Sequence, residues 1–325
     1  MTHDVVCLRP EADFARVGAL PPQSLKVVYR QPDDAQLPAL LKEASAMVMP
    51  AVGPKLAPAL FEGSRLRLVQ VTGAGVDRLD APAMKRLGIP VANVPGGSNG
   101  AVAEYAVTAA SLLLRRFGWA DAEIRRGNYV AFRARLLADN LPALEGLTVG
   151  VIGLGVIGLA VAQGFSRFGC KLYYCDPEPR NSSAAASLGA KSLSLDELMR
   201  TADVVCVHVP LLPSTRGLIG ERQLAAMKPG AVLVQASRGG VVDEAALAAL
   251  LRSGHLGGAA VDVYATEPIA ADNPLLALEG DAARKLLLTP HIAGVTRQSY
   301  ALLFRSSWEN VERALKGEPP HNRVY

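Results

Sequence analysis

The chain has 325 residues, of which 50% are hydrophobic and 20% charged, a composition typical of folded globular proteins and not of disordered or fibrous ones. This length is sufficient for two domains, each with its own hydrophobic core. The formal net charge is only +4, and basic residues occur singly or in pairs such as Arg115-Arg116, with no basic tract interleaved with aromatic side chains. Composition and charge therefore argue against nucleic acid as a partner.

The absence of a recognisable targeting signal and the pattern of cysteines favour a cytoplasmic protein. The N-terminus lacks the basic segment and apolar run of a signal peptide. The uncharged span Leu147–Phe165 is nearly long enough to cross a bilayer, but its repeated glycines favour a nucleotide-binding turn over a membrane helix. We expect reduced thiols, with neither a disulfide nor a metal site, because no Cys-x-x-Cys pair or clustered histidine accompanies the four cysteines, Cys7, Cys170, Cys175 and Cys206.

The first part of the chain alternates short strand-like runs with helical ones, which predicts a small doubly wound parallel unit without a glycine fingerprint. Helices are expected at Leu37–Glu43 and Lys55–Glu62. The expected strands are Asp4–Leu8, Leu25–Tyr29, Ala46–Pro50, Leu66–Val71 and Pro90–Asn93.

A long apolar helix, Ala101–Phe117, should follow, at a domain junction or a subunit interface. A second α/β series then begins, and a final amphipathic helix is expected at about Ser299–Lys316. The strands of this series are predicted at Thr148–Ile152, Lys171–Cys175, Val204–Val207, Ala231–Gln235, Gly258–Val263 and Leu286–Thr289.

The beginning of the second series carries a dinucleotide-binding fingerprint, Gly153-Leu-Gly155-Val-Ile-Gly158, between a strand and a helix. The N–H groups near Val156 and Ile157 would meet the phosphates. Asp176 ends the next strand, where its carboxylate should accept hydrogen bonds from a ribose diol and repel a 2′-phosphate. This favours NAD over NADP, although the nearby Arg180 can offset that repulsion. The alternative is a tight turn without a ligand.

Three ionisable residues follow strands of the second series, where ligands of open α/β sheets bind. They are Arg238, Glu267 and His291. Each also has a purely structural interpretation. Arg238 could pair with Asp243 at a helix start, Glu267 could lie in an exposed turn, and His291 could be a turn residue after a proline.

Together these three side chains have the chemistry needed to reduce a 2-keto acid with a nicotinamide hydride. His291 suits proton transfer near neutral pH. Glu267, if bonded to the other imidazole nitrogen, would fix the tautomer and favour the imidazolium. Arg238 can hold a substrate carboxylate and polarise the carbonyl.

Motifs along nearly the whole chain resemble those of the D-isomer-specific 2-hydroxyacid dehydrogenases, which include D-lactate, glyoxylate/hydroxypyruvate and 3-phosphoglycerate dehydrogenases. Besides the fingerprint, the matching segments are Thr72-Gly-Ala-Gly-Val-Asp77, Asn93-Val-Pro-Gly96, Val102-Ala-Glu104, Ala202-Asp-Val-Val-Cys-Val-His-Val-Pro210, Met227-Lys-Pro-Gly230, Ser237-Arg-Gly-Gly-Val-Val-Asp243 and Pro290-His-Ile-Ala-Gly294.

The resemblance implies an α/β protein of two Rossmann-like domains with an interdomain cleft and an Arg238, Glu267 and His291 catalytic set. Residues 1–97 and 296–325 would form a flavodoxin-like substrate domain, and residues 98–295 an NAD domain with a dimerisation helix and arm. The backbone of Gly73, Ala74 and Gly75 would bind the substrate carboxylate. Asp262 would bind the nicotinamide carboxamide or, alternatively, cap a turn. The family's cofactor contacts fall on the glycine fingerprint, Val156, Ile157, Asp176, His208, Val209, Pro210, Ala236, Ser237, Arg238, Asp262, His291 and Gly294.

Departures from the family pattern favour a small, unphosphorylated substrate. Val71 stands where phosphoglycerate dehydrogenases usually have an arginine, and their regulatory C-terminal domain is not seen. Ala74 replaces both the lysine of phosphite dehydrogenases and the hydroxyl residue that several relatives place beside the cofactor, and Glu267 replaces the Gln of formate dehydrogenases. We therefore expect a homodimeric NAD-dependent dehydrogenase of a D-2-hydroxy acid. The alternative is an NAD(H)-sensing protein related to co-repressors.

Overall fold

The computed structural model describes residues 4–179 and 181–325. Two compact units divide the chain: unit 1 comprises Met1–Ser98 with Val295–Tyr325, and unit 2 comprises Asn99–Gly294. Each boundary differs by one residue from the domain limits expected from the sequence. The chain therefore leaves unit 1, completes unit 2 and returns to unit 1 for its last helix.

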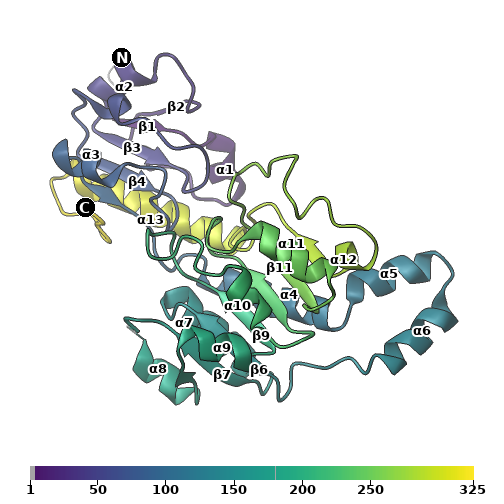
Figure 1. The fold of residues 1–325 in the computed structure, drawn as a ribbon. Coiled ribbons are helices and arrows are strands. Elements are labelled where there is room, and N and C mark those ends of the chain that lie inside the picture. The colour runs from purple at the N-terminus through teal and green to yellow at the C-terminus, as the bar shows by residue number, and fades with distance from the viewer. Residues whose placement is uncertain (1–3, 180) are drawn as a thin grey trace. The chain divides into compact units, whose positions relative to one another are not determined.

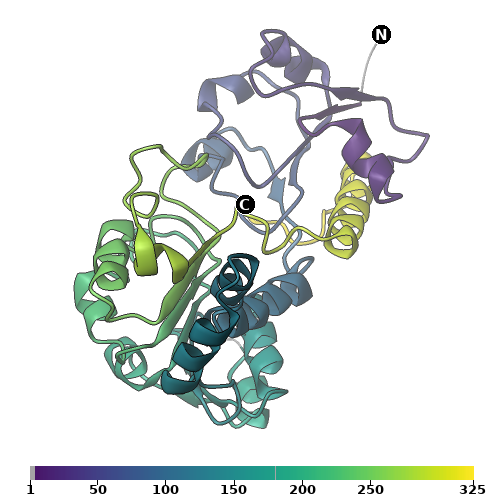
Figure 2. The ribbon, with the colours of Figure 1, turned by 90° about the vertical axis from the view of Figure 1, so that its right-hand side faces the viewer.

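Unit 1 is a five-stranded parallel sheet in the order β2-β1-β3-β4-β5, which is the flavodoxin-like order. Its strands are apolar and covered by helices on both faces, as parallel sheets require. The last helix, α13, begins after Thr296, whose side chain caps the Ser299 N–H, and packs along β3 and β4 (Figures 1 and 2). The elements are β1 (Val5–Cys7), α1 (Glu11–Arg16), β2 (Val27–Tyr29), α2 (Leu37–Glu43), β3 (Ala46–Met49), the 3-10 helix η1 (Pro58–Phe61), β4 (Leu68–Val71), α3 (Ala81–Arg86), β5 (Val91–Ala92) and α13 (Arg297–Leu315).

Unit 2 is a seven-stranded parallel sheet in the order β12-β11-β10-β9-β6-β7-β8. The strand order reverses between β6 and β9, which is the switch point where doubly wound sheets bind dinucleotides. The elements are α4 (Asn99–Leu114), α5 (Phe117–Arg125), α6 (Tyr129–Ala138), β6 (Thr148–Ile152), α7 (Val156–Ser166), β7 (Lys171–Cys175), α8 (Ser182–Ser187), β8 (Lys191–Ser192), α9 (Leu195–Thr201), β9 (Val204–Val207), α10 (Glu221–Ala225), β10 (Val232–Gln235), α11 (Glu244–Arg252), β11 (Gly258–Val261), α12 (Gly280–Arg284) and β12 (Leu286–Leu288).

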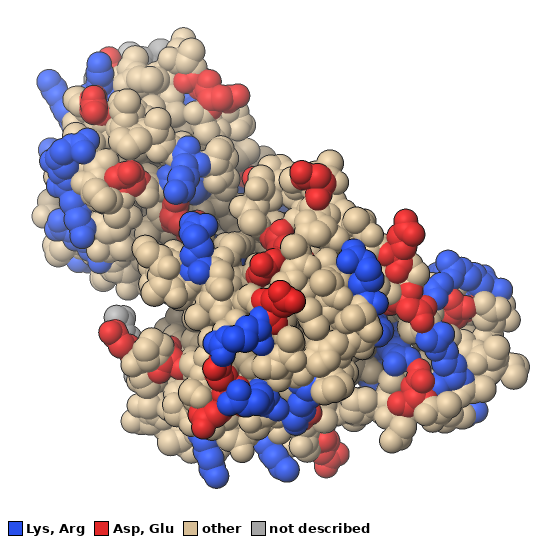
Figure 3. Space-filling model, in the orientation of Figure 1, with Lys and Arg blue, Asp and Glu red and all other residues tan. Residues whose placement is uncertain are grey.

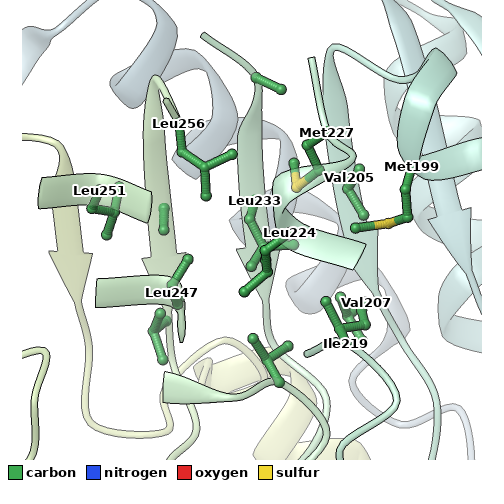
Figure 4. Close-up of a cluster of buried hydrophobic side chains, with 14 of the residues drawn as sticks. Met199, Val205, Val207, Ile219, Leu224, Met227, Leu233, Leu247, Leu251 and Leu256 are labelled. Atoms are coloured by element: carbon green, nitrogen blue, oxygen red, sulfur yellow. The ribbon is translucent and has the colours of Figure 1, made fainter. Parts of the chain in front are cut away.

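The two faces of the unit 2 sheet have separate hydrophobic cores because side chains alternate along each strand. Val205 and Val207 of β9 pack with Leu247 and Leu251 of α11 on one face (Figure 4). Val204 and Cys206 of β9 pack on the other face, against α4 and α7. The sheet is therefore fixed from both sides, and the turns at its carboxyl ends project from a rigid base.

The structure corrects the predicted helix Ala101–Phe117. Helix α4 ends at Leu114, Arg116 has a left-handed backbone with φ of 53°, and Phe117 begins α5. The apolar run stops at Arg115 and Arg116, but Phe117 resumes it and a helix can carry two arginines on an exposed face, so the hydrophobic pattern alone does not reveal the break. The predicted helix Lys55–Glu62 is shortened to η1, because Pro58 disfavours a helical conformation at the preceding residue.

The surface of unit 2 carries interspersed charges of both signs on the face shown in Figure 3. All four cysteines are unpaired, two of them buried and two half-buried. Within the described residues, no helix has the length and apolar character needed to cross a membrane. In the same part of the chain, no three His, Cys, Asp or Glu side chains gather as metal ligands.

Candidate active site

The three ionisable residues selected from the sequence lie in turns after adjacent strands of unit 2. Arg238 follows β10, Glu267 follows β11 and His291 follows β12. These strands are neighbours in the sheet and run parallel, so their carboxyl ends lie along one edge. The fold therefore places all three turns on the side where such sheets bind ligands.

A hydrogen bond of 2.8 Å joins His291 Nδ1 to Glu267 Oε2. Because a carboxylate only accepts, Nδ1 carries the proton and Nε2 is left as the nitrogen that can exchange a proton with a substrate. The other oxygen, Glu267 Oε1, accepts from the Tyr264 N–H at 3.1 Å, which holds the carboxylate against its own turn. Burial raises the pKa of Glu267, but the hydrogen bond and charge of His291 oppose it and the net pKa is lowered. Glu267 is therefore a fixed carboxylate beside the imidazole.

Asp262 holds the turn that carries His291. Its carboxylate accepts from the backbone N–H groups of Ile292 and Ala293, both at 2.8 Å, and from Thr289 Oγ1 at 2.6 Å. The His291 N–H in turn donates to the Asp262 carbonyl at 2.8 Å. His291 has φ of 56°, a conformation that non-glycine residues rarely adopt, so these bonds stabilise a strained backbone.

The geometry of Asp262 matches the turn-capping alternative stated above. Both carboxylate oxygens are engaged by the turn, and the residue is almost fully buried. A carboxylate has about four lone-pair positions, so capping does not exhaust its capacity to accept. Contact with a nicotinamide carboxamide stays a prediction.

Arg238 lies in a turn that is closed by a residue the sequence analysis missed. Gln235, the last residue of β10, donates through Nε2 to the Arg238 carbonyl at 2.9 Å and accepts from Ser237 Oγ at 2.8 Å. Arg238 itself donates through Nη1 to the Ser237 carbonyl at 2.7 Å. The only feature of the sequence that could have indicated this role of Gln235 is a polar amide at the end of the otherwise apolar strand Val-Leu-Val-Gln. Ala236 lies in the same turn.

Tyr105 and Thr289 were also missed. Tyr105 of α4 shares a 2.7 Å hydrogen bond with Thr289 Oγ1, which bonds Asp262. The pair joins residues far apart in the sequence, so no local pattern could reveal it. It connects the long helix of unit 2 to the His291 turn.

The glycine fingerprint is required by close backbone contacts. Gly153 has φ of 91°, and a Cβ there would lie 2.5 Å from the His208 carbonyl oxygen. A Cβ at Gly158 would lie 1.9 Å from the Gly153 carbonyl oxygen, so the helix could not approach the strand. The Asp176 carboxylate accepts from the Leu154 N–H at 2.7 Å, which joins the end of β7 to the glycine loop.

The residues at the start of α7 fit the phosphates of a dinucleotide. No side chain caps this helix, and the N–H groups of Val156 and Ile157 have no acceptor among the described residues. A side chain at Gly155 would meet open space. These N–H groups are therefore available to an anion, as at other helix N-termini, and their contact with the cofactor phosphates stays a prediction.

The loop after β9 supplies a second observation that fits a cofactor. Both ring nitrogens of His208 are buried, and neither has a hydrogen-bond partner within the described chain. Burial lowers the pKa of His208 to about 4, so the ring is neutral and can donate one hydrogen bond and accept another. Val209 and Pro210 follow it. Arg180, which the sequence placed near the ribose, lies outside the described residues.

The predicted carboxylate-binding loop of unit 1 follows β4. Ala74 O accepts from Asn93 Nδ2 at 2.6 Å, and Gly73 O accepts from the Val94 N–H at 2.9 Å. The N–H groups of Gly73, Ala74 and Gly75 have no acceptor among the residues that the structure describes. Val71 is buried within the sheet. The loop carbonyls are therefore bonded while its N–H groups are open to an anion.

Comparison with known proteins settles the family. Residues 107–293 match the family model described as D-isomer specific 2-hydroxyacid dehydrogenase, NAD binding domain. The chain belongs to this family. Unit 2 is therefore the family's NAD-binding domain, and NAD is its cofactor.

Relatives of several activities resemble the chain. It is 36% identical over 318 residues to a D-3-phosphoglycerate dehydrogenase of Mycobacterium tuberculosis, covering 98% of this chain but 58% of that protein. It is 38% identical to an (S)-sulfolactate dehydrogenase of Chromohalobacter salexigens, covering 77% and 78%. A crystal structure of D-lactate dehydrogenase from Aquifex aeolicus with NAD and lactic acid has a TM-score of 0.84 at 27% identity, covering 98% of each chain. The chain thus spans little more than half the length of the curated phosphoglycerate dehydrogenases it matches.

Proposed function

We propose that this protein is an NAD-dependent dehydrogenase that interconverts a D-2-hydroxy acid and its 2-keto acid. The observation that carries the proposal is the 2.8 Å bond between His291 and Glu267 at the carboxyl edge of an NAD-binding sheet. The bond orients an imidazole whose second nitrogen is available for proton transfer. Family membership supports the same reaction class.

In keto-acid reduction, His291 Nε2 donates the proton that the carbonyl oxygen acquires, and in oxidation it accepts that proton. Glu267 holds the ring and stabilises its imidazolium form. Arg238 binds the substrate carboxylate and polarises the carbonyl. The N–H groups of Gly73, Ala74 and Gly75 in unit 1 are proposed as further donors to the carboxylate. When bound, the nicotinamide supplies or takes up the hydride at C2.

Cofactor choice should favour NAD over NADP because of Asp176. Its carboxylate lies at the end of β7 and is fixed by the N–H groups of Leu154 and Glu178. A 2′-phosphate would approach this negative charge. The proposed preference for NAD(H) therefore rests on charge repulsion at one residue.

We propose a small, unphosphorylated substrate. The curated relatives include enzymes named for phosphorylated and sulfonated acids. Val71 is apolar and buried at the position where a phosphate-binding arginine is expected in phosphoglycerate dehydrogenases. A phosphate without a guanidinium partner would be poorly stabilised.

We also propose that the protein acts as a cytoplasmic homodimer. The unpaired cysteines suit a reducing compartment. Helices α5 and α6 expose apolar side chains, including Tyr129, Val130 and Leu137, that a second copy could cover. No other macromolecular partner is required by the proposal.

A substrate screen tests the function. NADH consumption should be followed with glyoxylate, hydroxypyruvate, pyruvate, phenylpyruvate, branched 2-keto acids and phosphohydroxypyruvate, using the His291→Asn variant as control. We expect turnover of at least one unphosphorylated acid and its loss in the variant. NADH binding without turnover of any acid would instead favour the NAD(H)-sensing alternative.

A further inference from the structure

Arg78, in the loop between β4 and α3, is a buried cation that the proposed chemistry does not use. Only 3% of its surface is exposed. Its Nε donates to the Pro54 carbonyl at 2.8 Å, and its Nη1 donates to the carbonyls of Pro50 at 2.8 Å and Val52 at 3.3 Å. One guanidinium thus binds three carbonyls of a single loop, residues 50–54, which follows β3.

The 50–54 loop depends on this side chain for its shape. It is irregular, and two of its five residues are prolines without an N–H donor. Removing the guanidinium would leave three carbonyls without their donor. The Arg78 carbonyl also accepts from the Leu56 N–H at 2.9 Å, which fixes the end of the loop.

The same loop lies directly against the predicted carboxylate-binding loop. The Thr72 N–H donates to the Met49 carbonyl at 2.8 Å, so the two segments leave the sheet side by side. A Cβ at Gly73 would lie 2.8 Å from Ala51 Cβ. Ala51 is therefore in contact with Gly73, and the 50–54 loop begins beside the N–H groups to which a substrate carboxylate would bind.

The chemistry of the loop surface is apolar. Its sequence is Pro50-Ala-Val-Gly-Pro54, without an ionisable or hydroxyl side chain, and Val52 is exposed. C3 of a 2-keto acid is two bonds from the carboxylate carbon, so a substituent on C3 begins three bonds away. With the carboxylate at Gly73, that substituent would contact this surface.

We propose that Arg78 is a positioning residue that holds the 50–54 loop as an apolar wall against the C3 substituent of the substrate, and so selects uncharged, apolar 2-keto acids. The inference rests on the proposed function and deepens it. Arg78 is not a ligand of a charged substrate group in this account, because its Nε and Nη1 are bonded to the loop. Its Nη2 has no hydrogen-bond partner within the described chain, but it is buried. Burial also lowers the pKa of Arg78, a shift that neighbouring Asp77 opposes.

The test compares a branched 2-keto acid, 4-methyl-2-oxopentanoate, with glyoxylate, which has no C3. In Arg78→Met and Arg78→Lys, KM for the branched acid should rise about tenfold or more, the size of a lost apolar pocket contact. Glyoxylate kcat/KM should change little, since only the wall is lost. Arg86→Met, at an exposed site in α3, is the matched control and should change neither value.

Two further measurements keep the proposal testable. Val52→Ser leaves the arginine contacts intact and should also raise KM for the branched acid alone, even where the Arg78 variants fold poorly. Trypsin cleavage after Lys55 should be faster in the Arg78 variants than in Arg86→Met, a readout that needs no activity. Absence of turnover in the parent would contradict the proposed function, whereas the cleavage result would still test the loop contact.

The proposal is overturned by either of two results. If the Arg78 variants lose kcat/KM equally for glyoxylate and for the branched acid, Arg78 supports the whole site and does not position a wall against the C3 substituent. Selective loss of activity toward phosphohydroxypyruvate would show that Arg78 binds a charged substituent directly.

Discussion

The carboxylate of Glu267 is expected to set the pH range in which His291 works. The pKa of Glu267 is lowered, so it remains charged above the ordinary glutamate pKa of about 4.3 and does not titrate with the imidazole. Keto-acid reduction needs the protonated imidazole and hydroxy-acid oxidation needs the neutral one. The two directions should therefore have opposite pH limbs.

Glu267→Gln keeps the shape of the side chain but removes its charge, so the imidazolium loses its stabilising partner. Reduction should then fail at a lower pH than in the parent, and oxidation should persist to a lower pH. The measurement is kcat/KM against pH in both directions, with hydride transfer shown to be rate-limiting by an isotope effect. Glu279→Gln, at an exposed site, serves as control. If the pH profiles of kcat/KM are the same in Glu267→Gln and in the parent, Glu267 does not influence the protonation of His291.

A second prediction at the residue scale concerns Asp176. Asp176→Asn keeps an oxygen that can accept from the Leu154 N–H but removes the negative charge. The ratio of kcat/KM for NADPH to that for NADH should rise roughly fivefold to a hundredfold, because the removed repulsion is worth roughly 1 to 3 kcal/mol at a partly exposed site. Equal use of both cofactors by the parent would contradict the assignment.

At the scale of the element, the turn from Thr289 to Ala293 should depend on Asp262. Asp262→Asn removes one acceptor oxygen, so a buried N–H or hydroxyl loses its partner at a cost of about 1 to 3 kcal/mol. We expect a lower thermal unfolding midpoint and a lower kcat, because the strained His291 backbone is no longer held. Asp272→Asn, which is exposed, is the control. An unchanged kcat in the variant would show that the turn orients His291 without Asp262.

Much of the element pattern could be predicted from the sequence because buried parallel strands are uniform apolar runs. Strands β6, β7 and β9 have the limits that their runs indicate. Strand β8, only Lys191–Ser192, was missed, since it is exposed and polar. The break at Arg116 was missed because it depends on a backbone angle and not on hydrophobicity.

The three ionisable residues of the candidate site could be selected because each follows a strand in a recognisable motif. The side chains that support these three residues could not be identified from the sequence. Gln235, Thr289 and Tyr105 act through hydrogen bonds that only the folded chain creates. In the sequence Arg78 is one of many scattered arginines, and only the fold shows that it binds three carbonyls.

At the scale of the whole molecule, helices α5 and α6 are candidates for the subunit contact. Their inner side is held to α12 by Arg284, which lies over the Trp119 ring, and by the ion pair of Arg135 with Asp281. On their other side Val130 and Leu137 are 79% and 65% exposed. Single exposed apolar side chains are ordinary, but three of them on one short helix, with Tyr129 as the third, suit a contact with a second copy.

The double substitution Val130→Glu with Leu137→Glu should convert the proposed dimer to a monomer, because the interface would then bury two charges without partners. Sedimentation velocity measures the outcome, and Leu20→Glu, at another exposed apolar site, is the control. A parent that sediments as a monomer would contradict the proposed assembly.

The central claim is that this chain transfers a hydride between NAD(H) and C2 of a D-2-hydroxy acid, with His291 as the proton donor. The most direct measurement supplies NADH that carries deuterium at both C4 positions, with the best 2-keto acid from the screen whose product is chiral. The product is then analysed by mass spectrometry and chiral chromatography. The account predicts one deuterium at C2, the D enantiomer, and loss of product in His291→Asn while NADH binding is retained. An L product, a product without deuterium, or full activity in His291→Asn would contradict it.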